Sequence, residues 1–66
     1  MITVETSMSG HVPEPGDPDV ILVEQALKVA CAQELVGKGG NVESITFDEP
    51  WYEEETWKIR GKGKAD

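Results

Sequence analysis

Residues 17–40 read DPDVILVEQALKVACAQELVGKGG, and they carry the clearest helix signal in the chain. Asp17 suits the N-cap position, and Pro18 suits the first helical position, where its missing N–H costs no hydrogen bond. At the other end, Gly37 is available as a left-handed cap, and further glycines prevent continuation. The sequence therefore predicts a helix from Pro18 to about Val36.

This helix should present one apolar stripe to a sheet, and it carries more apolar residues than that stripe needs. The stripe consists of Val20, Val23, Leu27, Ala30 and Cys31. A helix that is apolar most of the way round is usually covered on more than one side, and one small sheet covers only one. We therefore expect the surplus apolar face to be buried against a second copy of the chain or a different protein. The residues expected in a homodimer interface are Ile21, Val29, Ala32, Leu35 and Val36.

Three segments around the helix alternate between apolar and polar residues, which is the period of a half-buried strand. They are residues 2–8, 42–48 and 56–60. The order is therefore β-α-β-β, and a helix followed by a hairpin can place the last strand between the other two. We expect an α+β fold in which a three-stranded, mostly antiparallel sheet is covered on one face by a single helix. The alternative order, with the second strand in the middle, requires a parallel first pair.

The last two strands should form a hairpin whose register is set by the burial of their apolar residues. Phe47 opposite Trp57, with Ile45 opposite Ile59, keeps all four side chains on one face. The connection between these strands contains Pro50, which suits a turn and not a strand interior.

Length and composition limit both the fold and the class of function. The 66 residues suffice for one domain, expected at residues 1–61, followed by a disordered basic tail at residues 62–66. The formal net charge is −7, and residues 1–57 alone carry −10, from twelve acidic residues and two lysines. We therefore expect no direct binding of nucleic acid, and we favour partners with basic surfaces. The sequence contains no signal peptide and no apolar run of membrane-spanning length, so we expect a cytoplasmic protein without membrane contact.

No constellation of residues supports catalysis, a cofactor or a metal site. Cys31 is the only cysteine and His11 the only histidine, which excludes an internal disulfide and a zinc site of the usual Cys/His type. His11 lies in a loop rich in proline and glycine, which is a poor scaffold for a catalytic triad. Cys31 is expected to be a small buried hydrophobe. We therefore expect a protein that is not an enzyme.

The segment between the last two strands is the best candidate for a contact surface. It places Trp51 and Tyr52 among five acidic residues, and Trp and Tyr are enriched at the energetically dominant positions of protein interfaces. An aromatic anchor within an acidic rim fits a basic partner surface, because opposite charges steer the encounter. The alternative is that Trp51 folds back to close the small core. The residues expected to bind protein are Asp48, Glu49, Trp51, Tyr52, Glu53, Glu54 and Glu55.

These features together predict a small, acidic, non-enzymatic protein-binding module. We expect an inhibitor that blocks the basic, nucleic-acid-binding surface of a larger protein, as small acidic phage and mobile-element accessory proteins do. The alternative is a self-associating structural or accessory subunit of a larger assembly, built on the surplus apolar face of the helix.

Overall fold

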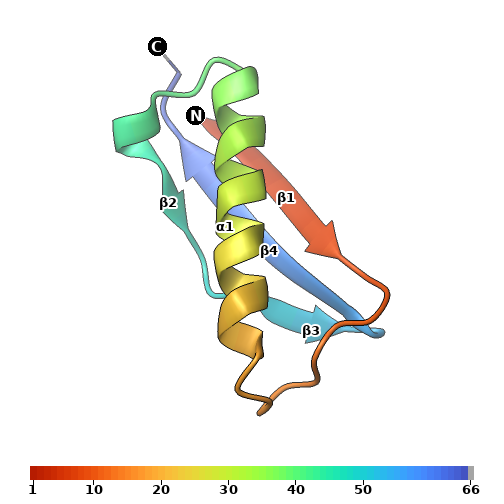
Figure 1. Cartoon of the computed structure of the whole chain (residues 1–66). Coiled ribbons are helices and arrows are strands. Elements are labelled where there is room, and N and C mark those ends of the chain that lie inside the picture. Colours follow the sequence, from red (N-terminus) through yellow and green to blue (C-terminus); the bar gives the residue numbers. More distant parts are fainter. Residues whose placement is uncertain (66) are drawn as a thin grey trace.

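A single helix lies along one face of a four-stranded antiparallel sheet (Figure 1). The structure is a computed structural model, and it describes residues 1–65. In chain order the elements are β1 (Ile2–Met8), α1 (Val20–Gly37), the short 3-10 helix η1 (Val42–Ser44), β2 (Thr46–Phe47), β3 (Trp51–Glu53) and β4 (Thr56–Gly63). The α+β class and the helix-on-sheet architecture are confirmed, with one strand more than we predicted.

The last strand, β4, is the centre of the sheet, and every other strand pairs with it in antiparallel orientation. β1 lies along one edge of β4, from Ile2 opposite Gly63 to Met8 opposite Trp57. β2 and then β3 share the other edge, one after the other. The last strand therefore lies between the first and the second, as predicted.

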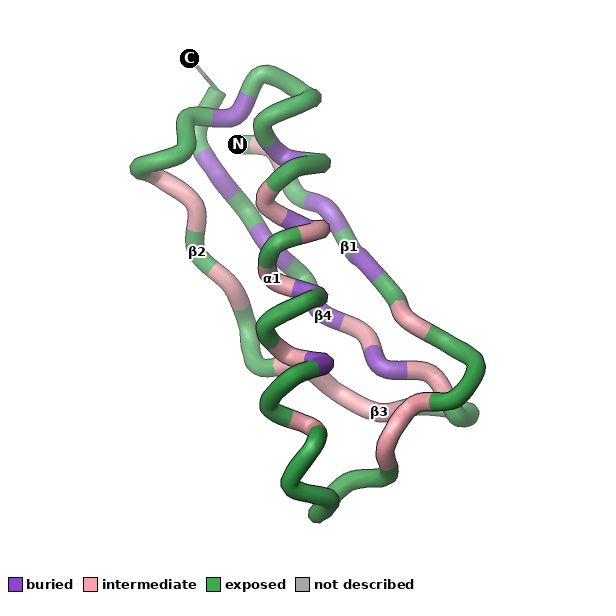
Figure 2. The backbone as a smooth tube through the Cα atoms, viewed as in Figure 1, coloured by how far each residue is buried: buried purple, intermediate pink, exposed green. Residues whose placement is uncertain are grey.

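The core lies between α1, β1 and β4 and follows the length of the molecule, as the buried positions in Figure 2 show. It consists of Val4, Val23, Leu27, Cys31, Leu35, Trp57 and Ile59. The four helical members recur every four residues, which keeps them on one face of α1. Leu35, which we predicted for the surplus face of the helix, is one of these core residues and is fully buried.

Close packing of the helix on the sheet depends on Gly61 in β4. A Cβ atom at this position would lie 2.6 Å from the Sγ atom of Cys31 and 3.1 Å from Cδ1 of Phe47. The missing side chain therefore lets α1 approach the sheet and lets Phe47 fold over the central strand.

The helix begins two residues later than predicted, at Val20 instead of Pro18. The Asp17 carboxylate accepts a hydrogen bond from the Asp19 N–H (2.8 Å), which closes a turn just before the helix. This is the hydrogen bond that a capping side chain accepts from the second residue after it, so Asp17 caps the turn that leads into the helix, whereas Asp19, at the N-cap position itself, makes no side-chain cap hydrogen bond.

The helix ends at Gly37, which belongs to the last helical turn and is not the left-handed cap. That conformation belongs to Gly39, with a φ of 91°. The Gly40 N–H then donates to the Leu35 carbonyl (2.9 Å), so a last-turn carbonyl is satisfied inside the reversal of the chain.

The second predicted strand, residues 42–48, is mostly not a strand. The Asn41 side chain accepts a hydrogen bond from the Glu43 N–H (2.9 Å), and this contact starts the 3-10 helix η1. Only Thr46 and Phe47 remain to pair with β4.

The predicted register of the hairpin is wrong. Phe47 lies opposite Gly61 and not Trp57, and Ile45 lies outside the strand instead of opposite Ile59. The cause is the greater length of β4. β2 pairs with Gly61 and Lys62, which lie beyond the predicted strand at residues 56–60. The hairpin itself is the shorter connection from β3 to β4.

The predicted disordered tail is corrected for residues 62–65. β4 continues to Gly63, and Ala65 forms an isolated bridge with Gly40. Glycine is tolerated in this strand because neighbours on both edges supply backbone hydrogen bonds. Asp66, the last residue of the predicted tail, lies outside the described residues.

Candidate functional site

The acidic segment ends in a tight hairpin at one end of the sheet (Figure 1). Only Glu54 and Glu55 connect the two strands, since Glu53 already pairs with Thr56. Both turn residues have positive φ values, 51° and 61°. A two-residue hairpin with two positive φ values has the pattern of a type I′ turn, which favours Asn-Gly because other side chains are strained in the left-handed region.

Replacing the turn residues with the preferred pair tests this geometry. We expect Glu54→Asn/Glu55→Gly to raise the free energy of unfolding by about 1–2 kcal/mol, because each strained residue costs about 1 kcal/mol or more. Thermal unfolding followed by circular dichroism should show Tm rising by roughly 4–8 °C for each kcal/mol. Glu54→Gln/Glu55→Gln is the control, since it removes the charges and keeps the strain. Equal Tm values for the two variants would show that the turn stores no strain.

Trp51 and Tyr52 point to opposite faces of the sheet, because consecutive residues of a strand alternate. Tyr52 lies opposite Trp57 and packs against it, with the ring centroids 5.2 Å apart. Trp51 lies opposite Lys58 on the open face, and the Arg60 guanidinium lies over its ring, 5.5 Å from the centroid. The predicted aromatic pair is therefore divided: Tyr52 closes the end of the core, and Trp51 is half-buried on the face that α1 leaves uncovered.

The acidic side chains of the segment follow one edge of β4, and all are exposed. We call Asp48, Glu49, Glu53, Glu54 and Glu55 the acidic edge. The Asp48 N–H donates to the Arg60 carbonyl (2.9 Å), whereas Glu53 pairs with Thr56 at the start of β4. Four residues of strand separate these two points, or about 13 Å at 3.3 Å per residue. Trp51 lies between them, opposite Lys58, so the predicted acids come before and after this residue along the same edge of β4.

Cations of β4 neutralise part of the open face. Lys58 Nζ donates to Glu53 Oε1 (2.9 Å), and Arg60 donates to Glu5 Oε2 (3.1 Å). The hydrogen bond from Lys58 to Glu53, together with the negative charge of Glu53, raises the pKa of Lys58 above its usual value. Within residues 1–65, the other four acids of the acidic edge form no salt bridge.

The sequence interpretation placed Lys58 and Arg60 on the outward face of the last strand and missed Lys62, the third cation of this row. β4 places Lys58, Arg60 and Lys62 at alternate positions of one strand. The alternation of TWKIRGKG continues through Gly61 and contains this signal, but we had ended the strand at Arg60.

Of the residues predicted for a homodimer interface, Ile21, Val29 and Val36 lie exposed on α1. The exposed large residues are Ile21, Leu22, Val29 and Val36 of α1 together with Val42 of η1. Ala32 is half-buried, and Leu35 is removed from the set because its side chain lies in the core. Leu22 and Val42, which the predicted interface omits, are 60% and 65% exposed.

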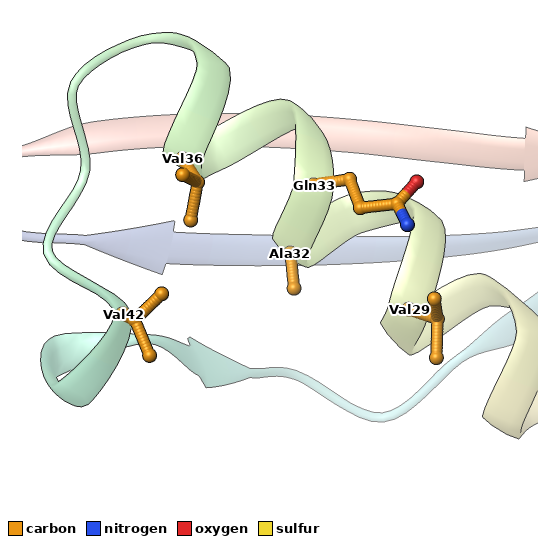
Figure 3. Close-up of a pocket in the computed structure, with 5 residues that line it drawn as sticks. All are labelled: Val29, Ala32, Gln33, Val36 and Val42. Carbon is orange, nitrogen blue, oxygen red and sulfur yellow. The ribbon is translucent and has the colours of Figure 1, made fainter.

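An open apolar groove of about 420 Å³ lies between α1 and η1 (Figure 3). It is lined by Val29, Ala32, Gln33, Val36 and Val42. Val42 faces the helix from η1, so the groove has one wall on each element. Small-molecule sites usually add a few convergent polar groups, and this groove has only the amide of Gln33, so it suits an apolar side chain of another protein.

The remaining candidates for chemistry are isolated side chains. Cys31 is fully buried, and its Sγ–H lies 3.8 Å from the Val4 carbonyl, in keeping with a small buried hydrophobe. His11 is exposed in the loop before α1. Within residues 1–65, no three His, Cys, Asp or Glu side chains are grouped so that they could hold a metal ion. No helix in that range is long and apolar enough to cross a membrane.

No protein-family model, no curated protein and no solved structure matches this chain. Function is therefore inferred from two surfaces, the acidic edge with Trp51 and the apolar outer side of α1.

Proposed function

We propose that this chain is a non-enzymatic protein-binding module, which docks its acidic edge and Trp51 on a basic surface of a larger protein. The observation that carries the proposal is the Glu54–Glu55 turn. Two acidic side chains occupy left-handed positions that Asn-Gly would fill with less strain. Strained backbone concentrates at functional sites, where the surroundings hold it in place. Contact with a partner therefore explains these acids better than folding does.

The charge of the acidic edge supports a basic partner. Four of its five acids are exposed and form no salt bridge within residues 1–65. Together they form a local negative field at one side of a chain that carries −7 overall. Such a field accelerates encounter with a basic surface and repels acidic ones, which gives both rate and selectivity.

Trp51 supplies an apolar contact in addition to the charges of the acidic edge. Its ring is half-buried, and the Arg60 guanidinium covers it while also pairing with Glu5. The ring is thereby held in one orientation before binding, so little side-chain entropy is lost when a partner covers it. Tryptophan is the residue most often found to dominate the energy of a protein interface.

The basic surface that this chemistry fits best is one that binds nucleic acid. A nucleic-acid-binding protein clusters Lys and Arg side chains to contact phosphates, and a row of carboxylates would bind these same side chains. The chain bound at such a site would exclude DNA or RNA, and we propose this block as its inhibitory activity.

Capture of the partner from a lysate of the source cells tests the proposal. The immobilised chain should retain a basic protein at about 50 mM salt and release most of it at about 500 mM, because salt screens exposed charges. Excess nucleic acid should compete for the captured protein. Glu54→Lys/Glu55→Lys should reduce capture by about tenfold or more, since it places like charges against a basic surface.

A matched variant separates the acidic edge from net charge. Glu24→Lys/Glu43→Lys changes the net charge by the same amount, and both residues lie outside the acidic edge. We expect this control to capture the partner nearly as well as the unmodified chain. Equal losses in the two variants, or capture that is indifferent to salt, would contradict the proposal.

A further inference from the structure

The outer side of α1 carries no charge, although it is the side of the helix that faces away from its own sheet. At 100° per residue, all of its members lie within about 60° of Val29, on the side opposite the core. We call this set the outer face: Leu22, Gln25, Ala26, Val29, Ala32, Gln33 and Val36. The charged residues of the helix lie nearer the sheet. Glu24 pairs with Lys28 (3.1 Å), and Glu34 accepts a hydrogen bond from Thr6 Oγ1 (3.2 Å).

The residues of the outer face have nearly the same order in both directions along the helix, and only Leu22 and Val36 at its ends differ. Counted from Val29, the matching positions are Leu22 with Val36, Gln25 with Gln33, and Ala26 with Ala32. In an antiparallel pair of identical helices centred on Val29, each residue lies level with its match in the second copy. An interface with two-fold symmetry uses the same patch on both copies, and this patch brings uncharged residues to uncharged residues along its whole length. We propose that two copies of the chain associate through this face as an antiparallel helix pair, independently of the acidic edge.

The groove beside η1 extends this face on the side of Ala32 and Val36, where Val42 adds an apolar wall. Leu22 and Val36 both lie seven residues, or about 10.5 Å along the axis, from Val29. Leu22 of the second copy therefore reaches the level of Val36. Both residues lie within about 20° of Val29 around the helix, so they meet near the centre of the interface, and the two-fold axis repeats this contact.

The smaller and polar residues of the face are compatible with this arrangement. Ala26 lies level with Ala32 of the second copy, so the two helices can approach closely. Gln25 and Gln33 lie about 40° from Val29 on opposite sides of the face, so both amides stay at the rims of the pair, where water satisfies their donors and acceptors. The outer face contains no charged side chain, so no charge has to lose its water when the copies meet.

The distribution of charge favours a second copy in the antiparallel orientation. The β3–β4 turn lies at the same end of the molecule as the start of α1 (Figure 1). An antiparallel pair therefore places the two acidic edges at opposite ends, which separates the strongest like charges. Because the outer face is uncharged, it offers no acidic side chain for a salt bridge with a basic partner. Both acidic edges stay accessible in the dimer.

Sedimentation equilibrium of the full chain tests the association. Between about 10 μM and about 1 mM, the range suited to a small and weak interface, the mass should rise from 7.2 kDa toward twice that value. Val29→Glu sets two carboxylates against each other at the symmetry axis, so this variant should remain at 7.2 kDa throughout. At low concentration, where both chains are monomers, its helix content and Tm should equal those of the unmodified chain, because Val29 is 59% exposed in a single copy.

Two further variants make the test specific. Thr3→Glu adds the same charge at an exposed β-branched residue of β1, and it should associate like the unmodified chain. Under mild oxidation, Val29→Cys should form a disulfide between copies, whereas Leu22→Cys should not, because its counterpart is Val36. A mass that stays at 7.2 kDa in the unmodified chain, association that survives Val29→Glu, or cross-linking of Leu22→Cys as fast as Val29→Cys would overturn the proposal.

Discussion

Gly61→Ala should lower the free energy of unfolding by about 1–3 kcal/mol, the usual cost of adding a methyl group to a well-packed core. The new Cβ would lie 2.6 Å from the buried Sγ of Cys31, closer than real Cβ atoms come to a neighbour. The total stability of a domain of this size is about 3–10 kcal/mol. Urea unfolding followed by tryptophan fluorescence should therefore show a clear loss.

Two control variants connect this loss to the contact between helix and sheet. Gly37→Ala adds a methyl group where nothing lies within 4 Å, so it should be neutral or stabilising. Cys31→Ala removes the sulfur that the new Cβ meets, so Gly61→Ala/Cys31→Ala should be more stable than the two single effects predict. Additive effects in this double-mutant cycle would contradict the packing described for Gly61.

Trp57→Ala should lower the free energy of unfolding by about 3–5 kcal/mol, enough to unfold much of the population. The Trp57 side chain is 6% exposed and forms the end of the core with Tyr52. Its Nε1–H donates to the Pro13 carbonyl (2.6 Å), which ties the loop before α1 to the sheet. Circular dichroism and urea unfolding measure the loss directly.

Two other substitutions keep this prediction testable if Trp57→Ala does not fold. Trp57→Phe retains an aromatic ring and removes the hydrogen bond to Pro13, so it should cost about 1–2 kcal/mol. Trp51→Ala should cost about 1 kcal/mol or less, because this half-buried ring lies outside the core. A larger loss at Trp51 than at Trp57 would reverse the roles assigned to the two tryptophans.

The parts of the fold that could be predicted are those with a long signal in the sequence. The helix around Leu27 is a long apolar segment bounded by proline and glycine, and residues 2–8 show a clear period of two. The central place of the last strand followed from connection rules and not from its own residues. β2 and β3 contain two and three residues, which is too few for a period to be seen.

The acidic site was predictable in its composition and not in its geometry. Pro50 led us to treat the whole segment as a turn, although β3 begins at the next residue. Once Trp51 and Tyr52 belong to a strand, alternation alone separates them onto opposite faces. The strain at Glu54 and the contact from Trp57 to Pro13 depend on the completed sheet, so no local pattern in the sequence contains them.

The two proposed surfaces are independent and compatible. The outer face of α1 would join two copies, while each acidic edge remains open to a basic partner. A dimer would then present two acidic edges to one partner or to two, and the second contact would gain from the high effective concentration that the first provides.

The most direct test of the account is the Kd of the captured basic partner for the unmodified chain and for Trp51→Ala. Isothermal titration calorimetry at low salt measures both, with circular dichroism confirming that the variant is folded. We predict a Kd about 30-fold higher for Trp51→Ala, corresponding to the roughly 2 kcal/mol typical of a dominant interface residue. A Kd within about twofold of the unmodified chain would contradict the account, because the contact surface would then lie elsewhere.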